Sequence, residues 1–370
     1  MKKNVIDLYA GVGGLSLGAA RAGFSVTAAV EIDKHALVAH KVNFPGVRHL
    51  GQDVSTLSGA RLLQLAGLAA GDLCGLIGGP PCQGFSEIGL QSKSDPRNDL
   101  LVDFFRLVAE TKPAFYVAEN VPGLLNPKNA ATLNRALALV PSGYTKLAPM
   151  IVAASDYGAP TSRKRVFFVG FDPERVDKLT RESFAPPEEK QDVRVRDALK
   201  GLPAIRSDWL EASQGWRAVA APGDGAFERR MAGEVPEGVG DPDSLKKYRE
   251  RRVVSGFLGT AHEEATVERF RALRHGEVDA VSRARRLDPA GYCPTIRAGT
   301  GSDRGSFQAV RPIHPNSPRV IAPREAARLQ GFPDWFQFHG TKWHAFRQIG
   351  NSVSPIVAES LLRAVAASVE

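Results

Sequence analysis

Two short segments carry the side chains best suited to chemistry. The stretch GGPPCQGFS places Cys82 directly after two prolines and before a glycine-containing turn, and the stretch AENV carries Glu119. The prolines fix two φ angles and remove two backbone donors, so the Cys82 thiol is held in a restricted direction. An ionised thiol is a nucleophile, and a carboxyl group can hold or move a proton. If the two segments end neighbouring strands, they present a nucleophile and a carboxylate to one crevice.

Each of these residues also has a structural interpretation. A buried apolar cysteine is the commoner fate of this residue type, and we assign it to Cys74, inside a predicted strand, while Cys293 is expected in a loop. Glu119 could be a surface carboxylate at a strand end. Three cysteines exclude a disulfide framework, and their spacing excludes a cysteine zinc site, so no metal is expected.

A basic pair follows in DYGAPTSRKRVFF. Arg163 and Arg165 are two residues apart at the start of a predicted strand, which places them on the same face. They could donate to a base carbonyl or to phosphates, and a nearby guanidinium would favour a thiolate. A solvated basic edge is the alternative.

The N-terminal stretch DLYAGVGGLSLG reads as a strand, a glycine-rich turn and a helix, which is an arrangement that lets a nucleotide-like ligand approach the backbone. A dinucleotide fingerprint would need glycine where Ser16 stands. Glu31, closing the next strand, could accept two ribose hydroxyls, and Asp53 could accept from an adenine amino group. Tight-turn chemistry without a ligand is the alternative.

The elements that must position these residues alternate between strands and helices. Short apolar runs predict strands at 5–11, 24–33, 72–79, 114–120, 144–154 and 165–171. Helical periodicity lies between most of them, as at 100–111, and returns at 323–331 and 351–369. The pattern predicts an α/β fold with a doubly wound, mostly parallel, Rossmann-like sheet, whose last helix packs back on the sheet.

Two domains are expected. Residues 1–185 form a catalytic and cofactor-binding domain, completed by 340–370, and residues 186–339 form a smaller, irregular domain. The formal charge of +8 and the pI of about 9.5 favour a polyanionic partner such as nucleic acid. No apolar run approaches the length of a membrane span, and the N-terminus lacks a signal-peptide pattern, so a soluble intracellular protein is expected.

The order of the motifs resembles the DNA (cytosine-5)-methyltransferase family. The matching pieces are DLYAGVGG, EIDKHA, GGPPCQGFS, AENVPG, DYGAPTSRKRVF, REAARLQGFPDWF and GNSVSP. They leave out about 186–317, which in this family is the variable target-recognition region. The resemblance implies S-adenosyl-L-methionine as cofactor, S-adenosyl-L-homocysteine as product, and a covalent bond from Cys82 to carbon 6 of a cytosine flipped out of a specific short duplex sequence.

The resemblance also implies roles for individual residues. Cys82, Glu119, Arg163 and Arg165 would be catalytic. The cofactor would lie against Tyr9, Ala10, Gly11, Gly13, Gly14, Leu15, Glu31, Ile32, Asp53, Val54, Pro81, Leu100, Asn351, Ser352 and Val353. DNA would be contacted by Gln83, Ser86, Arg97, Arg283, Arg285, Arg286, Thr295, Arg297 and Arg304. Two positions depart from the family pattern: Tyr9 stands where phenylalanine is usual, and Thr161 where glutamine is usual.

The resemblance further implies a context. The protein would be a monomeric prokaryotic enzyme of the cytoplasm and nucleoid, with double-stranded DNA as its partner. A cognate restriction endonuclease would act on the same site without forming a stable complex with it. An RNA (tRNA) cytosine-5 methyltransferase on the same scaffold is the alternative. A nicotinamide dehydrogenase disagrees with Ser16 and leaves Cys82 and Glu119 without a role. A non-catalytic DNA-binding relic would need a lost catalytic residue, and none is lost.

Overall fold

The computed structural model describes residues 3–81, 99–189, 191–205, 215–233, 235–298 and 310–369. Five of the residues singled out above lie outside these ranges, namely Cys82, Gln83, Ser86, Arg97 and Arg304. Their neighbours in the chain are described, so the ends of the elements that lead to them can be placed.

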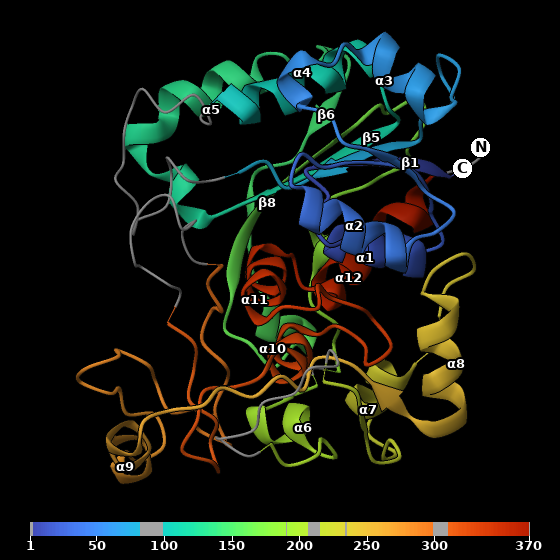
Figure 1. Cartoon of the computed structure of the whole chain (residues 1–370). Helices are drawn as coiled ribbons and strands as arrows, with labels where there is room; N and C mark the ends of the chain where they lie inside the picture. Colours follow the sequence, from blue (N-terminus) through green and yellow to red (C-terminus); the bar gives the residue numbers. More distant parts are fainter. Residues whose placement is uncertain are drawn as a thin grey trace.

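One mixed sheet of eight strands organises the described residues (Figure 1). The strand order is β3-β2-β1-β4-β5-β8-β6, with β7 also paired to β8. The strands are β1 (Asn4–Leu8), β2 (Ser25–Val30), β3 (Arg48–Leu50), β4 (Gly75–Gly78), β5 (Phe115–Asn120), β6 (Thr145–Lys146), β7 (Met150–Ala153) and β8 (Lys164–Phe171). The neighbouring strands β3, β2, β1, β4 and β5 run parallel to one another. Strand β8 is antiparallel to β5, β6 and β7. The expected mostly parallel, doubly wound sheet is therefore confirmed.

The prediction of one strand over 144–154 is wrong. Two short strands, β6 and β7, replace it, and both pair with β8. Pro149 lies between them and has no backbone N–H to give to a ladder, which explains the interruption. Both residues of β6 are exposed, so this end of the segment also lacks the burial that the apolar pattern suggested.

Helices cover both faces of the sheet (Figure 1). On one face lie α3 (Gly59–Ala66), α4 (Leu100–Thr111) and α5 (Ala130–Leu137), and on the other lie α1 (Gly14–Arg21), α2 (Lys34–Asn43) and α12 (Pro355–Ser368). The apolar face of α4, with Leu101, Phe104 and Val108, is completely buried against the strands. Burying an apolar side chain of this size contributes roughly 1.5–3 kcal/mol.

The expected C-terminal helix over 351–369 is present as α12, although it begins only at Pro355. A further helix, α11 (Lys342–Asn351), precedes it. Proline is favoured in the first helical turn because its missing N–H is not needed there. As predicted, α12 packs back on the sheet domain, along α1, and the Nζ of Lys3 donates to the carbonyl oxygen of Ala366 at 2.8 Å.

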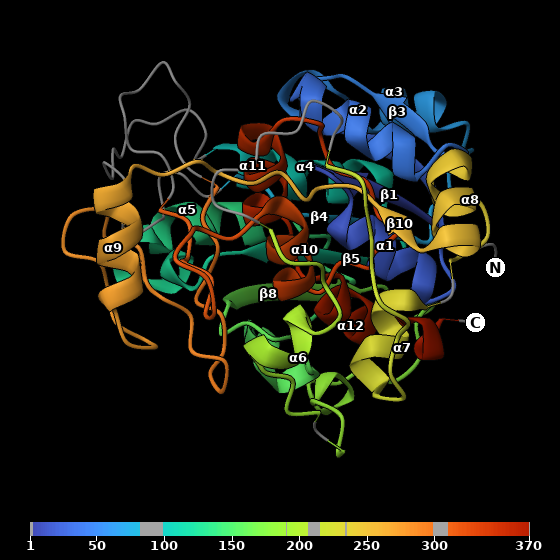
Figure 2. The same ribbon diagram turned by 60° about the horizontal axis from the view of Figure 1, so that its bottom comes forward.

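The remaining elements lie at one end of the molecule, below the sheet in Figure 1 and toward the viewer in Figure 2. They are α6 (Val195–Leu199), β9 (Arg217–Ala218), α7 (Ala226–Ala232), α8 (Pro242–Arg251), β10 (Val253–Val254), α9 (Glu264–Ala272) and α10 (Pro323–Gln330). One apolar cluster continues from the sheet through α12 and α10 to this part, including Val195 and Phe227. The proposed boundaries at 185 and 339 therefore stay predictions.

Helix α10 carries the charged part of the motif REAARLQGFPDWF, and its charges are buried. The Glu325 carboxylate accepts hydrogen bonds from two guanidinium nitrogens of Arg319 at 2.7 and 2.8 Å. Arg328 donates to both carboxylate oxygens of Asp334 at 2.7 Å. The third buried guanidinium of this region, Arg324, donates to three backbone carbonyls. Each charge is paired or hydrogen-bonded, as burial requires, so this motif has a structural role.

None of the described helices is both long enough and apolar enough to span a bilayer.

Candidate active site

A cavity of about 830 Å³ opens at the carboxyl ends of β1, β2, β4 and β5. The chain leaves β1 for β2 on one side and returns as β4 on the other side of β1. The loops at such a reversal of strand order diverge, and they leave a crevice between them. The volume is in the range of pockets that hold a ligand of several hundred daltons.

The glycine loop after β1 forms one wall. Gly11 has a φ of +57° and open space beside it, and it lines the cavity together with Tyr9 and Ala10. Gly14 sits against the C-terminal motif, because a Cβ there would come within 2.2 Å of the Ser352 Oγ. A side chain at Gly13 would instead meet the Phe44 ring, at 2.4 Å, and Gly13 does not line the cavity.

Glu31, at the end of β2, is held by two backbone amides. Its Oε2 accepts from the N–H of Gly11 at 2.8 Å and its Oε1 accepts from the N–H of Asp33 at 2.7 Å. Burial raises the pKa of Glu31, while these two bonds act in the opposite direction. Each carboxylate oxygen has a further lone pair, so the group can still accept from ligand hydroxyls in the cavity.

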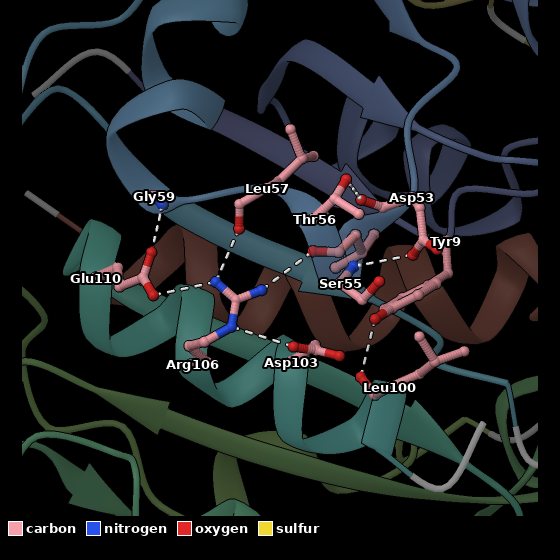
Figure 3. A network of polar contacts seen from close by, with 11 residues as sticks. Tyr9, Asp53, Ser55, Thr56, Leu57, Gly59, Leu100, Asp103, Arg106 and Glu110 are labelled. Atoms are coloured by element: carbon pink, nitrogen blue, oxygen red, sulfur yellow. Dashed lines mark hydrogen bonds and ion pairs between the residues drawn. The ribbon is translucent and has the colours of Figure 1, made fainter. Parts of the chain in front are cut away.

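A polar network fixes the opposite wall (Figure 3). The Arg106 guanidinium, from α4, donates to the carbonyls of Leu57 and Val54 at 2.8 and 3.1 Å, which ties α4 to the segment that carries Asp53 (Figure 3). The Tyr9 hydroxyl donates to the carbonyl of Leu100 at 2.8 Å. The aromatic side chain at position 9 is thus locked against the start of α4.

The two strand ends predicted to share a crevice do meet. Asn120 donates through its Nδ2 to the carbonyl of Pro80 at 3.2 Å, and a Cβ on Gly79 would lie only 3.1 Å from the Glu119 Oε2. The described backbone that leads directly into Cys82 therefore runs beside Glu119. Both Pro80 and Pro81 line the cavity.

Glu119 is paired with the arginine of the neighbouring strand. The Arg165 Nε lies 2.8 Å from the Glu119 Oε1, and Glu119 is only 8% exposed. This pairing arises because β8 is antiparallel to β5, so β8 begins at the edge where β5 ends. A charged partner compensates the desolvation of the carboxylate.

Arg163 is positioned differently from Arg165, although both line the cavity. It is 3% exposed and donates to the carbonyl of Gly350 at 2.9 Å, which links the start of β8 to α11. Thr161 donates to the carbonyl of Cys293 at 3.0 Å and accepts from the N–H of Arg163 at 3.3 Å. Cys293, expected in a loop, is fully buried at this junction.

A chain of buried polar groups runs beneath the glycine loop. The Ser16 hydroxyl donates to the Asp7 Oδ2 at 2.7 Å, the His40 Nε2 lies 3.0 Å from the Ser16 Oγ, and the His49 Nε2 lies 2.9 Å from the His40 Nδ1. If the Nε2 atoms of His40 and His49 carry the ring protons, each hydrogen bond of this chain is donated in the direction of Asp7. Ser16, which excluded a dinucleotide fingerprint, is therefore part of the support of this loop.

Asp7 is expected to lower the free energy of unfolding as the pH rises. Burial raises its pKa from 3.8 to about 7. Because the folded pKa exceeds the unfolded one, the stabilisation from the bound proton is complete below about pH 4 and is lost as the pH rises toward 7. The full difference corresponds to about 4 kcal/mol. Asp7→Asn removes this loss, so the variant should gain stability relative to the parent between pH 5 and 8.

Urea denaturation midpoints of both proteins at several pH values measure this difference. Subtracting one curve from the other cancels the titration of the groups that do not interact with Asp7. The exposed Asp243→Asn on α8 serves as the control and should follow the parent at every pH. A difference for Asp7→Asn that does not change with pH would contradict the expectation.

The structure brings most of the described candidate residues into one cavity. Its lining includes Glu119, Arg163, Arg165, Tyr9, Ala10, Gly11, Gly14, Leu15, Glu31, Ile32, Asp53, Val54, Pro81, Leu100, Asn351, Ser352 and Val353. Sequence reasoning missed the contribution of α11, which adds His344, Arg347 and Gln348. The one available signal was the helical period of 342–351, directly before GNSVSP.

The described residues expected at DNA lie on the 283–297 segment. Arg283, Arg285 and Arg297 are exposed, and Thr295 is half-buried. Arg286 differs from them, because its guanidinium donates to the carbonyls of Phe270, Arg271, Leu273 and Pro315. These bonds hold the segment against the end of α9. The role of all these residues in DNA contact stays a prediction.

The cavity offers groups that suit a nucleoside ligand. Ile32 lines the cavity and is 65% exposed, so it offers a bare apolar side chain for an adenine ring. The lone pairs that remain on Glu31 suit ribose hydroxyls. Asp99 and Asp103 also line the cavity, but each is paired with an arginine, and further arginines line the same cavity.

Comparisons with known proteins place this geometry in one family. A family model described as C-5 cytosine-specific DNA methylase matches residues 3–367. The Type II methyltransferase M.XorII of Xanthomonas oryzae pv. oryzae is 40% identical, over 96% of this chain and 82% of the relative. The crystal structure of a prophage-encoded E. coli protein superposes with a TM-score of 0.88 at 48% identity, covering 99% of both chains.

A more distant likeness is to the Dnmt2 methyltransferase of S. pombe. The TM-score is 0.60 at 16% identity, covering 97% of this chain and 96% of that one. An identity this low supports the shared fold alone.

Proposed function

Because this chain belongs to the C-5 cytosine-specific DNA methylase family, and is a DNA (cytosine-5)-methyltransferase of the restriction-modification type, we propose that it transfers a methyl group from S-adenosylmethionine to a cytosine flipped out of a short duplex DNA sequence. The observation that carries the proposal is the meeting of the GGPP segment with Glu119 at the cavity. That contact places Pro80 and Pro81, the residues directly before Cys82 in the chain, at the same cavity as Glu119.

The chemistry explains why these side chains are needed together. Carbon 5 of cytosine is a weak nucleophile. When the Cys82 thiolate forms a bond to carbon 6, the ring becomes an enamine, and carbon 5 can then attack an electrophilic methyl group. S-adenosylmethionine supplies that methyl group. Removal of the carbon 5 proton by a base then restores the ring double bond and expels the thiolate.

Glu119 holds the N3 and N4 edge of the base in this proposal. A carboxylate next to that edge stabilises the positive polarisation that develops as the thiolate adds. Arg165 keeps the Glu119 side chain in place, since its Nε lies 2.8 Å from the Oε1. Arg163 acts as a positioning residue, because it donates hydrogen bonds to the backbone carbonyls of Gly350, on α11, and of Ile296.

The cofactor is proposed to lie between the glycine loop and α4. Glu31 accepts from the ribose, Asp53 from the adenine amino group, and Ile32 packs on the ring. Pro81, Leu100 and the residues 351–353 close the cavity. Extruding the base from the duplex costs a few kcal/mol, which contacts in the cavity recover.

Methyl-labelled S-adenosylmethionine, duplex DNA of mixed sequence and total tRNA test the substrate class. We expect label in DNA, at carbon 5 of cytosine, and none in tRNA. Bisulfite sequencing of DNA from cells that express the chain then identifies the recognition sequence. Label in tRNA alone would favour the RNA methyltransferase instead. The S. pombe likeness does not favour it, because it extends to the fold only.

The exposed arginines of the 283–297 segment are proposed to contact the duplex, with the part of the chain around 186–339 acting as the recognition domain. We further propose that the enzyme works as a monomer. A cognate endonuclease would cut the same sequence when it is unmethylated, without a stable complex between the two proteins.

A further inference from the structure

Three histidines meet where α2 and α11 pack together (Figure 1). His35 lies in the first turn of α2, His339 precedes α11, and His344 lies in its first turn. One nitrogen from each ring lies within 4.8 Å of the others. His35 and His344 also line the cavity, but none of the three histidines has a part in the methyl-transfer chemistry proposed above.

One of the separations is close to that of two ligands on a bound transition metal. The His35 Nδ1 lies 3.2 Å from the His339 Nε2. Two imidazole nitrogens on a tetrahedral Zn²⁺ are about 3.3 Å apart, given metal–nitrogen distances of about 2.05 Å. The spacing of His339 and His344, with four residues between them, is also typical of paired zinc ligands.

Surrounding groups hold the histidines in this arrangement. The buried Gln348 accepts from the His339 N–H at 2.9 Å and donates to the His35 carbonyl at 3.0 Å, so one side chain fixes both backbones. The His339 Nδ1 accepts from the N–H of Thr341 at 3.1 Å, which leaves its Nε2 as the protonated nitrogen that faces the His35 Nδ1. When Nε2 binds a metal, the ring proton moves to Nδ1, so the Thr341 N–H must give up this contact and the Thr341 Oγ1, 3.1 Å away, becomes the acceptor.

The charge around the cluster is balanced. The Asp33 carboxylate lies at the start of α2, and its Oδ2 is 3.5 Å from an Arg347 guanidinium nitrogen. The N-termini of α2 and α11 disfavour a cation, whereas three metal–nitrogen bonds would favour it. Without a metal the His339 Nε2 can donate to the His35 Nδ1, so the ion competes with one hydrogen bond.

We propose that His35, His339 and His344 bind one divalent transition-metal ion of the zinc class. The ion would join α2, which follows the ribose-binding strand, to α11, which lines the other side of the cavity. Water completes the coordination. This departs from the sequence-based expectation of no metal.

Zinc and cobalt titrations of the tag-free, chelator-treated full chain test the site. We expect one equivalent of Zn²⁺ by calorimetry, visible absorption of tetrahedral Co²⁺, and a rise of a few degrees in Tm with excess Zn²⁺. His339→Asn and His344→Asn should each weaken binding at least tenfold and abolish the rise in Tm. The matched control is His275→Asn, an exposed histidine after α9, which should bind like the parent.

The outcome does not depend on methyl transfer. If His339→Asn fails to fold without metal, the exposed His35→Asn serves in its place. Measuring all variants in a Cys82→Ser background removes a thiolate that could bind the same ions. The proposal is refuted if the parent binds no metal ion, or if the histidine variants bind it as tightly as the parent does.

Discussion

Cys82→Ser is expected to lower the rate of methyl transfer at least about 10³-fold while the protein still binds its cofactor. An unperturbed thiol is about one-tenth ionised at pH 7.5, whereas a serine hydroxyl is essentially never ionised there. The bond to carbon 6 therefore forms far more slowly in the variant. The measurement is the single-turnover rate with labelled cofactor and DNA that carries the identified sequence.

The other two cysteines provide matched controls. Cys74 and Cys293 are both fully buried, and burial raises the pKa of the Cys74 thiol to about 11 and that of Cys293 still further. Cys74→Ala and Cys293→Ala should keep methyl transfer, with some loss of stability. DNA with 5-fluorocytosine at the target should trap a covalent adduct, because fluorine cannot leave carbon 5 as a proton does. An adduct that persists in Cys82→Ser would mean that another residue is the nucleophile.

Glu119→Gln is expected to reduce kcat by about 10²–10⁴-fold, with little change in cofactor affinity. Glutamine keeps the size of the side chain but loses the charge, and with it the interaction with Arg165 and the stabilisation of the polarised base. The adduct with 5-fluorocytosine should also form more slowly, since the carboxylate acts during the addition of the thiolate.

A double-mutant cycle with Arg165→Gln distinguishes a catalytic pair from two independent residues. If Arg165 acts through Glu119, the double variant should be about as slow as Glu119→Gln alone, because the two effects are not additive. Melting temperatures and cofactor affinities identify variants that are merely misfolded. Equal kcat values for Glu119→Gln and the parent would exclude Glu119 from the chemistry.

The strand-end residues were predictable because of a regularity of parallel sheets. Glu31 and Glu119 each close an apolar run, and parallel strands bring such ends to one edge, so the sequence order already indicated a shared crevice. The glycine-rich turn was equally visible, since the chain can adopt a φ of +57° at Gly11 without strain. The pairing of Arg165 with Glu119 was less accessible, because it requires β8 to run antiparallel.

What the sequence by itself determined is therefore the α/β class, the family and the residue types at the strand ends, since each of these is encoded over short stretches. Only the tertiary structure decided that Arg163 faces α11, that the charges of α10 are buried ion pairs, and that His35 meets His339 across 304 positions of the chain. The physical reason is that such contacts depend on how helices pack against one another, and no local period or motif records that packing.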